Sequence, residues 1–179
     1  MLPILLHDGE GIAGGFLSGI LHPLAGPDHL VAMVAVGLWG AFLGAPAIWV
    51  LPVVFPLVMA VGAILGLAEV AIPFVESGIA ISAIVLGLMV AFAAKPALPV
   101  AALLVGIFAI FHGHAHGTEL PASADALAYS LGFVLATGAL HLAGIGLGFA
   151  VEKPGGRKFV RGCGAVIAIV GLGYLTGVL

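Results

Sequence analysis

Long apolar segments separated by short polar connections make up most of this chain. A membrane-spanning helix needs about 20 mostly apolar residues. Six segments of the sequence meet that requirement: 11–42, 47–68, 74–94, 97–116, 124–151 and 159–179. Because every connection is short, the pattern predicts an all-α fold, a polytopic membrane helix bundle of about six transmembrane helices. We expect residues 1–179 to form a single integral membrane domain.

The first of these segments is too long for one straight span. As an α-helix it would extend for about 48 Å, against a hydrocarbon core of about 30 Å. It contains the stretch HPLAGPDH, in which Pro27 removes one backbone hydrogen bond and clashes with the carbonyl of Pro23. Gly26 permits unusual backbone torsions. The sequence therefore predicts that the first transmembrane helix is broken or kinked at Pro23–Pro27.

The composition supports an integral membrane protein. Hydrophobic residues make up 63% of the chain and charged residues only 7%, whereas soluble domains contain about 25% charged residues. The net charge of −3 gives no indication of a nucleic-acid partner. GxxxG spacings such as Gly62–Gly66 and Gly144–Gly148 predict close helix packing within the bundle. The single cysteine, Cys163, excludes an intrachain disulfide and a CxxC metal site.

The charged residues predict the orientation of the bundle. All five basic residues lie in or beside two connections: Lys95, Lys153, Arg157, Lys158 and Arg161. Acidic residues occupy the other polar ends, with Glu152 as the exception: Asp8, Glu10, Glu69, Glu76, Glu119 and Asp125. Six alternating helices place the two sets on opposite faces, so the positive-inside rule predicts both termini on the non-cytoplasmic side. Trp39 and Trp49 are expected to be interface anchors on the cytoplasmic side.

Six of the seven histidines fall within or at the ends of predicted helices: His22, His29, His112, His114, His116 and His141. Ionisable groups at membrane depth are costly unless paired, so they are candidates for function. On an unbroken helix, His22 and His29 would share a face but lie about 10 Å apart, too far for one metal ion. A break would bring them together, and Asp28 would then cap the second half-helix, ligate a metal directly or orient an imidazole.

A second cluster lies in the stretch FHGHAHGTE, residues 111–119. His112 and His116 are spaced i, i+4 and share a helix face, whereas His114 points to the far side of a regular helix. Glu119 lies at the outer mouth, where its carboxylate could attract a cation. Imidazole-rich, thiol-free ligation favours Ni²⁺, Co²⁺, Zn²⁺ or Cu²⁺ over Mg²⁺ or Ca²⁺. The expected ion is bound or transported, and no prosthetic group is expected.

The depths of two histidines suggest a path rather than a single closed cage. His22 is expected about 16 Å from the outer side, and His141 about 20 Å along the fifth helix from the same side. All eight candidate ligands are thus distributed from the entrance to the interior of the bundle: His22, Asp28, His29, His112, His114, His116, Glu119 and His141.

The stretch HPLAGPDHLVAMVAVGLWGA, residues 22–41, resembles the HupE/UreJ family. The segment HGHAHGTE at 112–119, the pair LH at 140–141 and the polar HDGEG start support the resemblance, which covers essentially the whole chain. It implies a nickel permease of the bacterial inner (cytoplasmic) membrane, moving Ni²⁺ or Co²⁺ toward the cytoplasm. It also implies a link to the maturation of nickel enzymes, hydrogenase and urease. The family's motifs fall on His22, Asp28 and His29, and on His112, His116 and Glu119.

The start of the chain departs from that family's pattern. Family members commonly carry a cleaved signal peptide that ends just before a histidine, and His7 occupies that place. The apolar stretch before His7 is shorter than the 7–15-residue core of a signal peptide. Either the chain has no signal peptide or the start is a processed remnant of one.

Two alternatives to a permease remain open from the sequence. An intramembrane metal-dependent hydrolase would need a general acid or base beside the metal, and Glu119 is the only carboxylate suited to that role. Ser82 and Ser130 are interpreted as packing residues rather than nucleophiles. A metal-binding accessory protein would bind the ion without moving it. There is no nucleotide-binding motif, so energy for transport would come from the membrane potential, a coupled ion or a partner.

Overall fold

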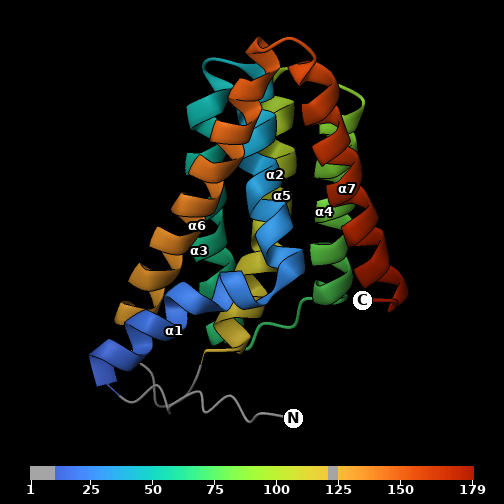
Figure 1. Ribbon diagram of the computed structural model, residues 1–179. Coiled ribbons are helices and arrows are strands. Elements are labelled where there is room, and N and C mark those ends of the chain that lie inside the picture. Colours follow the sequence, from blue (N-terminus) through green and yellow to red (C-terminus); the bar gives the residue numbers. More distant parts are fainter. Residues whose placement is uncertain (1–10, 121–124) are drawn as a thin grey trace, which may run out of the picture.

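The structure is a computed structural model that describes residues 11–120 and 125–179, with side-chain surroundings from residue 14 onward (Figure 1). His7, Asp8 and Glu10, to which the sequence assigned expectations, lie outside these residues. The described ranges contain the helices α1 (Gly11–Ala25), α2 (Pro27–Leu43), α3 (Ala47–Leu67), α4 (Val75–Ala91), α5 (Leu98–Thr118), α6 (Ala126–Gly148), the 3₁₀ helix η1 (Phe149–Glu152) and α7 (Gly156–Thr176). Within these ranges every regular element is helical, which confirms the predicted all-α class.

Helices α2 to α7 run between the same two ends of the bundle in alternating directions (Figure 1). Among the described residues, α3, α5, α6 with η1, and α7 have the length and apolarity of membrane spans. The bent pair of α1 and α2 adds a fifth span, and α4 is a shorter apolar helix of 17 residues. Each predicted segment is therefore helical, and the chain is a multi-pass membrane helix bundle.

The charged connections lie at opposite ends of this bundle (Figure 1). The α4–α5 connection, with Lys95, and the α6–α7 connection, with Lys153, form what we call the basic end. The α3–α4 connection, with Glu69, lies at the other end, as do Glu119 after α5 and Asp125 before α6. We call this second end the acidic end. Among the described residues, the separation of the two charge sets is the one that the sequence predicted.

The predicted break in the first segment is confirmed, and it is sharp. Gly26 has extended backbone torsions (φ −96°, ψ 101°), and Pro27 begins α2, where a missing N–H costs nothing because the first turn has no internal acceptor for it. The axes of α1 and α2 differ in direction by 83°. As a result, α1 lies across the acidic end instead of descending into the bundle (Figure 1).

The glycines explain how α1 is held in this position. Gly19 of α1 lies directly against the carbonyl of Tyr129, and Gly132 of α6 lies against the carbonyl of Phe16. Neither site has room for a Cβ atom. The same kind of contact joins α3 to α5 and α2 to α6, where Gly62 and Gly144 pack on opposing backbone. These contacts confirm the prediction of close helix packing for the Gly62–Gly66 and Gly144–Gly148 spacings.

Two expectations about individual side chains are wrong. His22 does not lie 16 Å deep, because α1 crosses the end of the bundle; its side chain is 29% exposed. Trp39 is fully buried and donates its indole N–H to the carbonyl of Ala94 over 3.2 Å, so it is not an interface anchor. Trp49, in contrast, is 63% exposed near the start of α3, at the basic end. Hydropathy alone could not distinguish the two tryptophans, since both follow apolar runs.

Candidate metal centre

Four imidazoles from three helices lie close together beside the break between α1 and α2. His22 comes from α1, His29 from the first turn of α2, and His112 and His116 from successive turns of α5. The ring centroids of His22 and His116 are 4.7 Å apart, those of His116 and His29 are 4.7 Å apart, and those of His29 and His112 are 4.9 Å apart. The centroids of His22 and His29 are 6.3 Å apart. The break therefore brings together two rings that a straight helix would separate by about 10 Å.

These side chains form two overlapping sets of three candidate ligands. In the set that we call the buried triad, His29, His112 and His116 each offer a nitrogen, and all three residues are buried. In the exposed triad, His22 and His116 offer nitrogens and Glu119 a carboxylate oxygen. Within each triad the ligand atoms lie within 4.8 Å of one another. His116 belongs to both triads, so one imidazole links the surface of the acidic end to the interior.

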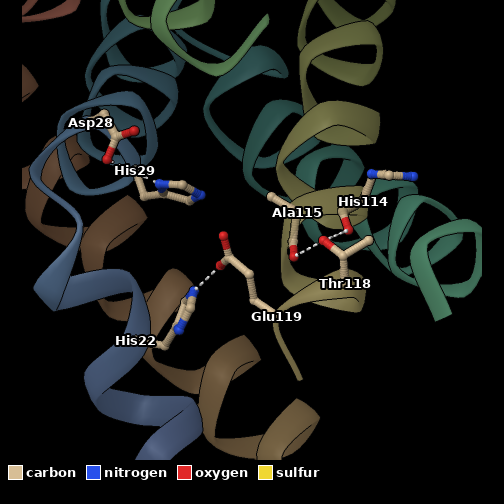
Figure 2. Close-up of polar contacts among 7 residues, drawn as sticks. All are labelled: His22, Asp28, His29, His114, Ala115, Thr118 and Glu119. Carbon is tan, nitrogen blue, oxygen red and sulfur yellow. Dashed lines mark hydrogen bonds and ion pairs between the residues drawn. The ribbon is translucent and has the colours of Figure 1, made fainter. Parts of the chain in front are cut away.

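Glu119 gives the exposed triad its negative charge. It follows the last turn of α5, and its Oε2 accepts a hydrogen bond from Nε2 of His22 over 3.1 Å (Figure 2). That hydrogen bond lowers the pKa of the Glu119 carboxyl, although partial burial opposes the shift. The side chain is 46% exposed. At neutral pH the acidic end thus presents an ionised carboxylate to the solvent beside two imidazoles.

Asp28 lies behind His29 rather than among the ligand atoms. Its Oδ1 is 3.1 Å from Nδ1 of His29 (Figure 2). A carboxylate can only accept, so Nδ1 carries the proton and Nε2 keeps a free lone pair. That Nε2 is buried and has no hydrogen-bond partner among the described residues. The N-cap of α2 is Gly26, and no side-chain cap is formed there. Asp28 could cap α2, ligate a metal ion directly or orient an imidazole, and the geometry matches the last of these roles, with His29 as the imidazole.

His114 and His141 lie away from both triads. His114 points to the far side of α5, where its Nε2 donates to the carbonyl of Val70 over 2.7 Å, as a regular helix predicts (Figure 2). His141 lies deeper, on α6, and is almost completely buried. The ring of Phe55 packs against both His112 and His141, with centroid distances of 5.4 Å to each. Phe55 therefore separates His141 from the buried triad.

Three residues at the centre were not identified from the sequence. Ser82 of α4, interpreted there as a packing residue, has its hydroxyl 2.9 Å from Nε2 of His112. Phe133 of α6 packs on His116 with ring centroids 4.1 Å apart, and Tyr129 lies 5.9 Å from His22. Tyr129 and Phe133 are spaced by four and share a helix face with His141, eight residues further along. That spacing was a usable signal for α6, whereas the contact of Ser82 depends on how α4 packs against α5.

The glycines of the HGHAHG stretch place its histidines. Gly113 lies directly against the carbonyl of Met59 in α3, and Gly117 against the carbonyl of Ala63. These two glycines occupy the face of α5 that meets the α3 backbone. His112 and His116 then project from another face of the helix toward α1 and α2. The close α3–α5 contact thereby fixes the position of two ligands.

Replacing Gly113 with alanine is expected to lower both the Tm and the metal affinity. The new methyl group would overlap the Met59 carbonyl and force α5 away from α3, and such overpacking typically costs about 1–3 kcal/mol. Gly106→Ala is the matched control on the same helix, because a Cβ there has its nearest neighbour at 3.8 Å. Thermal unfolding and metal titration of both detergent-solubilised variants check the expectation. Equal Tm and affinity for the two variants would contradict it.

Similarity to known proteins extends over nearly the whole chain. Residues 1–174 match the protein family described as "HupE / UreJ protein". The chain is also similar to Protein HupE of Rhizobium leguminosarum bv. viciae, with 46% identity over 177 residues, which is 98% of this chain and 93% of that protein. No solved structure is significantly similar to the chain. Because the family match covers residues 1–174 and the identity to this relative extends over 98% of the chain, the chain belongs to the HupE/UreJ family of membrane proteins.

Proposed function

We propose that this protein is a permease that moves Ni²⁺, with Co²⁺ as the second candidate, from the outside to the cytoplasm. The observation that carries the proposal is the sharing of His116 by an exposed and a buried triad. A site that only stores an ion needs one closed ligand set. Two sets with a common member favour movement of the ion from one to the other.

The charge distribution supports the direction. The positive-inside rule assigns the basic end to the cytoplasm of a bacterial inner membrane and the acidic end, with both triads, to the outside. Cations would arrive at the ionised carboxylate of Glu119. Inward movement of a divalent cation down a potential of 100 mV is favourable by about 4.6 kcal/mol. Such an ion would supply nickel enzymes, hydrogenase or urease, during their maturation.

The transfer proceeds by exchange of a few ligands at a time. His22, His116 and Glu119 bind the ion at the acidic end. His116 remains bound while His29 and His112 replace His22 and Glu119, so the ion never returns to bare solvation between the two triads. From the buried triad the ion moves past Phe55 toward His141. Stepwise exchange keeps the barrier between the two triads low, because during that step the ion is never left without ligands in a medium of low dielectric constant.

The ligand chemistry supports a first-row transition metal. The buried triad offers three imidazoles, and Asp28 supports one of them through its other ring nitrogen, an arrangement found around many metal-bound histidines. No thiolate belongs to either triad. Imidazole ligands suit Ni²⁺, Co²⁺, Zn²⁺ and Cu²⁺, and the family resemblance points to Ni²⁺ among them.

A hydrolase is less well supported by the same geometry. Metal-dependent hydrolysis needs an acid or base next to an open coordination position. Glu119 is engaged by His22, and Asp28 is engaged by His29. Ser82 donates its hydroxyl proton to the Ile79 carbonyl, and its oxygen lies 2.9 Å from Nε2 of His112. The polar side chains around the buried triad therefore contact the ligands instead of being directed at a substrate.

Uptake of ⁶³Ni into proteoliposomes tests the proposal. Wild-type protein is expected to accumulate the isotope when an inside-negative potential is applied, whereas His29→Ala and His112→Ala are expected to lose most of this flux. His114→Ala is the matched control, because this residue lies on the far side of the same helix. Binding of Ni²⁺ without accumulation would favour the accessory-protein alternative. Equal accumulation by all four proteins would refute the assignment of the buried triad.

A further inference from the structure

We propose that Ser82 is a positioning residue that fixes which ring nitrogen of His112 is presented to the metal ion. Ser82 holds the proton of His112 on Nε2 and so leaves the lone pair of Nδ1 free for ligation in the buried triad. This inference deepens the proposed function and rests on its assignment of the buried triad as a metal site.

The argument begins with the single proton of the serine hydroxyl. Ser82 is fully buried in α4, and its Oγ lies 2.6 Å from the carbonyl oxygen of Ile79. A carbonyl oxygen can only accept, so the hydroxyl proton is directed to Ile79. The same Oγ lies 2.9 Å from Nε2 of His112. With its only proton already donated, Ser82 can only accept from His112, and Nε2 must carry a hydrogen.

The consequence for His112 follows from imidazole chemistry. A neutral imidazole carries one N–H and one lone pair. Once Nε2 carries the hydrogen, Nδ1 has the lone pair that a metal ion requires. Nδ1 of His112 is buried and has no hydrogen-bond partner among the residues the structure describes. An orphaned buried acceptor is costly, and ligation in the buried triad would compensate it.

Two histidines of the buried triad have a hydrogen-bonded neighbour, and these neighbours hold them in opposite tautomers. Asp28 accepts a hydrogen bond from Nδ1 of His29 and leaves the lone pair of Nε2 free, whereas Ser82 accepts a hydrogen bond from Nε2 of His112 and leaves the lone pair of Nδ1 free. Neither ring nitrogen of His116 has a hydrogen-bond partner among the described residues. The shared ligand is thus the member of the buried triad whose tautomer no described neighbour fixes.

The tautomer can be measured without any transport. In full-length protein labelled with ¹⁵N-histidine and held in lipid nanodiscs, the two ring nitrogens of His112 have distinct chemical shifts for the N–H and the lone-pair state. We expect wild-type His112 to be protonated at Nε2 and Ser82→Ala to show a mixture of tautomers. Ser82→Thr keeps the hydroxyl and is expected to restore the wild-type pattern. Ser130→Ala is the control, because Ser130 also donates to a backbone carbonyl of its own helix but has no histidine partner within residues 11–120 and 125–179.

Metal affinity provides the second readout. Loss of an outer-shell partner typically weakens metal binding by about 10–100-fold, and we expect Ni²⁺ titration of Ser82→Ala to give a loss in that range. A wild-type His112 protonated at Nδ1 overturns the proposal, even if Ser82→Ala does not fold. A mixture of His112 tautomers in Ser82→Ala together with an unchanged Ni²⁺ affinity also overturns the proposal. If the wild-type tautomer is as expected but vesicles take up no metal, the proposed function fails and the role of Ser82 stands.

Discussion

Replacing His116 with alanine is expected to abolish metal uptake and to weaken binding more than the loss of any other single histidine. His116 is the one residue common to the exposed and buried triads, so its removal leaves two ligands in each. Outer-shell losses alone weaken metal sites by about 10–100-fold, and the loss of a direct ligand from both triads should exceed that range. Removal of His22 or of His112 affects a single triad and should leave measurable binding at the other.

The measurement is a comparison of Ni²⁺ affinity and ⁶³Ni flux for His116→Ala, His22→Ala and His112→Ala. His114→Ala is again the control, because its side chain donates to the carbonyl of Val70 on the opposite face of α5. His116 also packs on Phe133, so a Tm for each variant must accompany the titrations. A folded His116→Ala protein that binds as tightly as His22→Ala would show that the two triads do not share a ligand in solution.

Joint replacement of Pro23 and Pro27 by alanine is expected to weaken metal binding at least tenfold, about 1.4 kcal/mol, with every ligand retained. Alanine restores the missing N–H and removes the ring clash, so α1 can continue into α2. On a continuous helix, His22 would lie about 10 Å from His29 along the axis, and His22 could no longer meet His116 and Glu119. The exposed triad would lose one ligand without any change to an imidazole.

Two measurements check this expectation. Ni²⁺ titration gives the affinity, and the distance between spin labels at Leu17 of α1 and Val53 of α3, both exposed, reports the direction of α1. Pro154→Ala is the control, because Pro154 lies in the α6–α7 connection at the opposite end. Unchanged affinity in a protein whose label distance has changed would show that the bend does not serve metal binding. An unchanged distance would show that Gly26 and the packing of α1 suffice to hold the bend.

Much of the architecture could be predicted from local sequence. The break follows from Pro27 and the length of the first segment, and the pairing of His112 with His116 follows from their i, i+4 spacing. The sequence leaves three roles open for Asp28. It shows that Asp28 is adjacent to His29, but it does not show in which direction either side chain points. The far-side position of His114 also followed from helix geometry.

The remaining features depend on how helices pack against one another. The bend angle is set by contacts of α1 with α6, among them Gly19 against the Tyr129 carbonyl, and those contacts made the expected depth of His22 wrong. Trp39 is buried because its face of α2 meets the α4–α5 connection, where Ala94 accepts its N–H. Ser82 reaches His112 across 30 positions of sequence. A lone serine in an apolar helix signals a buried hydrogen bond, but it does not identify the partner.

Phe55 has a consequence for the energy balance of the membrane. Buried histidines and hydroxyls aligned through a bundle are the groups that proton pumps use as relays, and a continuous row of them would let the proton gradient leak away. Between His112 and His141 the row meets the ring of Phe55, fully buried and in contact with both imidazoles. A benzene ring can neither donate nor accept a proton. Among the described residues, the row of imidazoles between His112 and His141 is therefore interrupted at Phe55, so these side chains alone form no continuous path for protons.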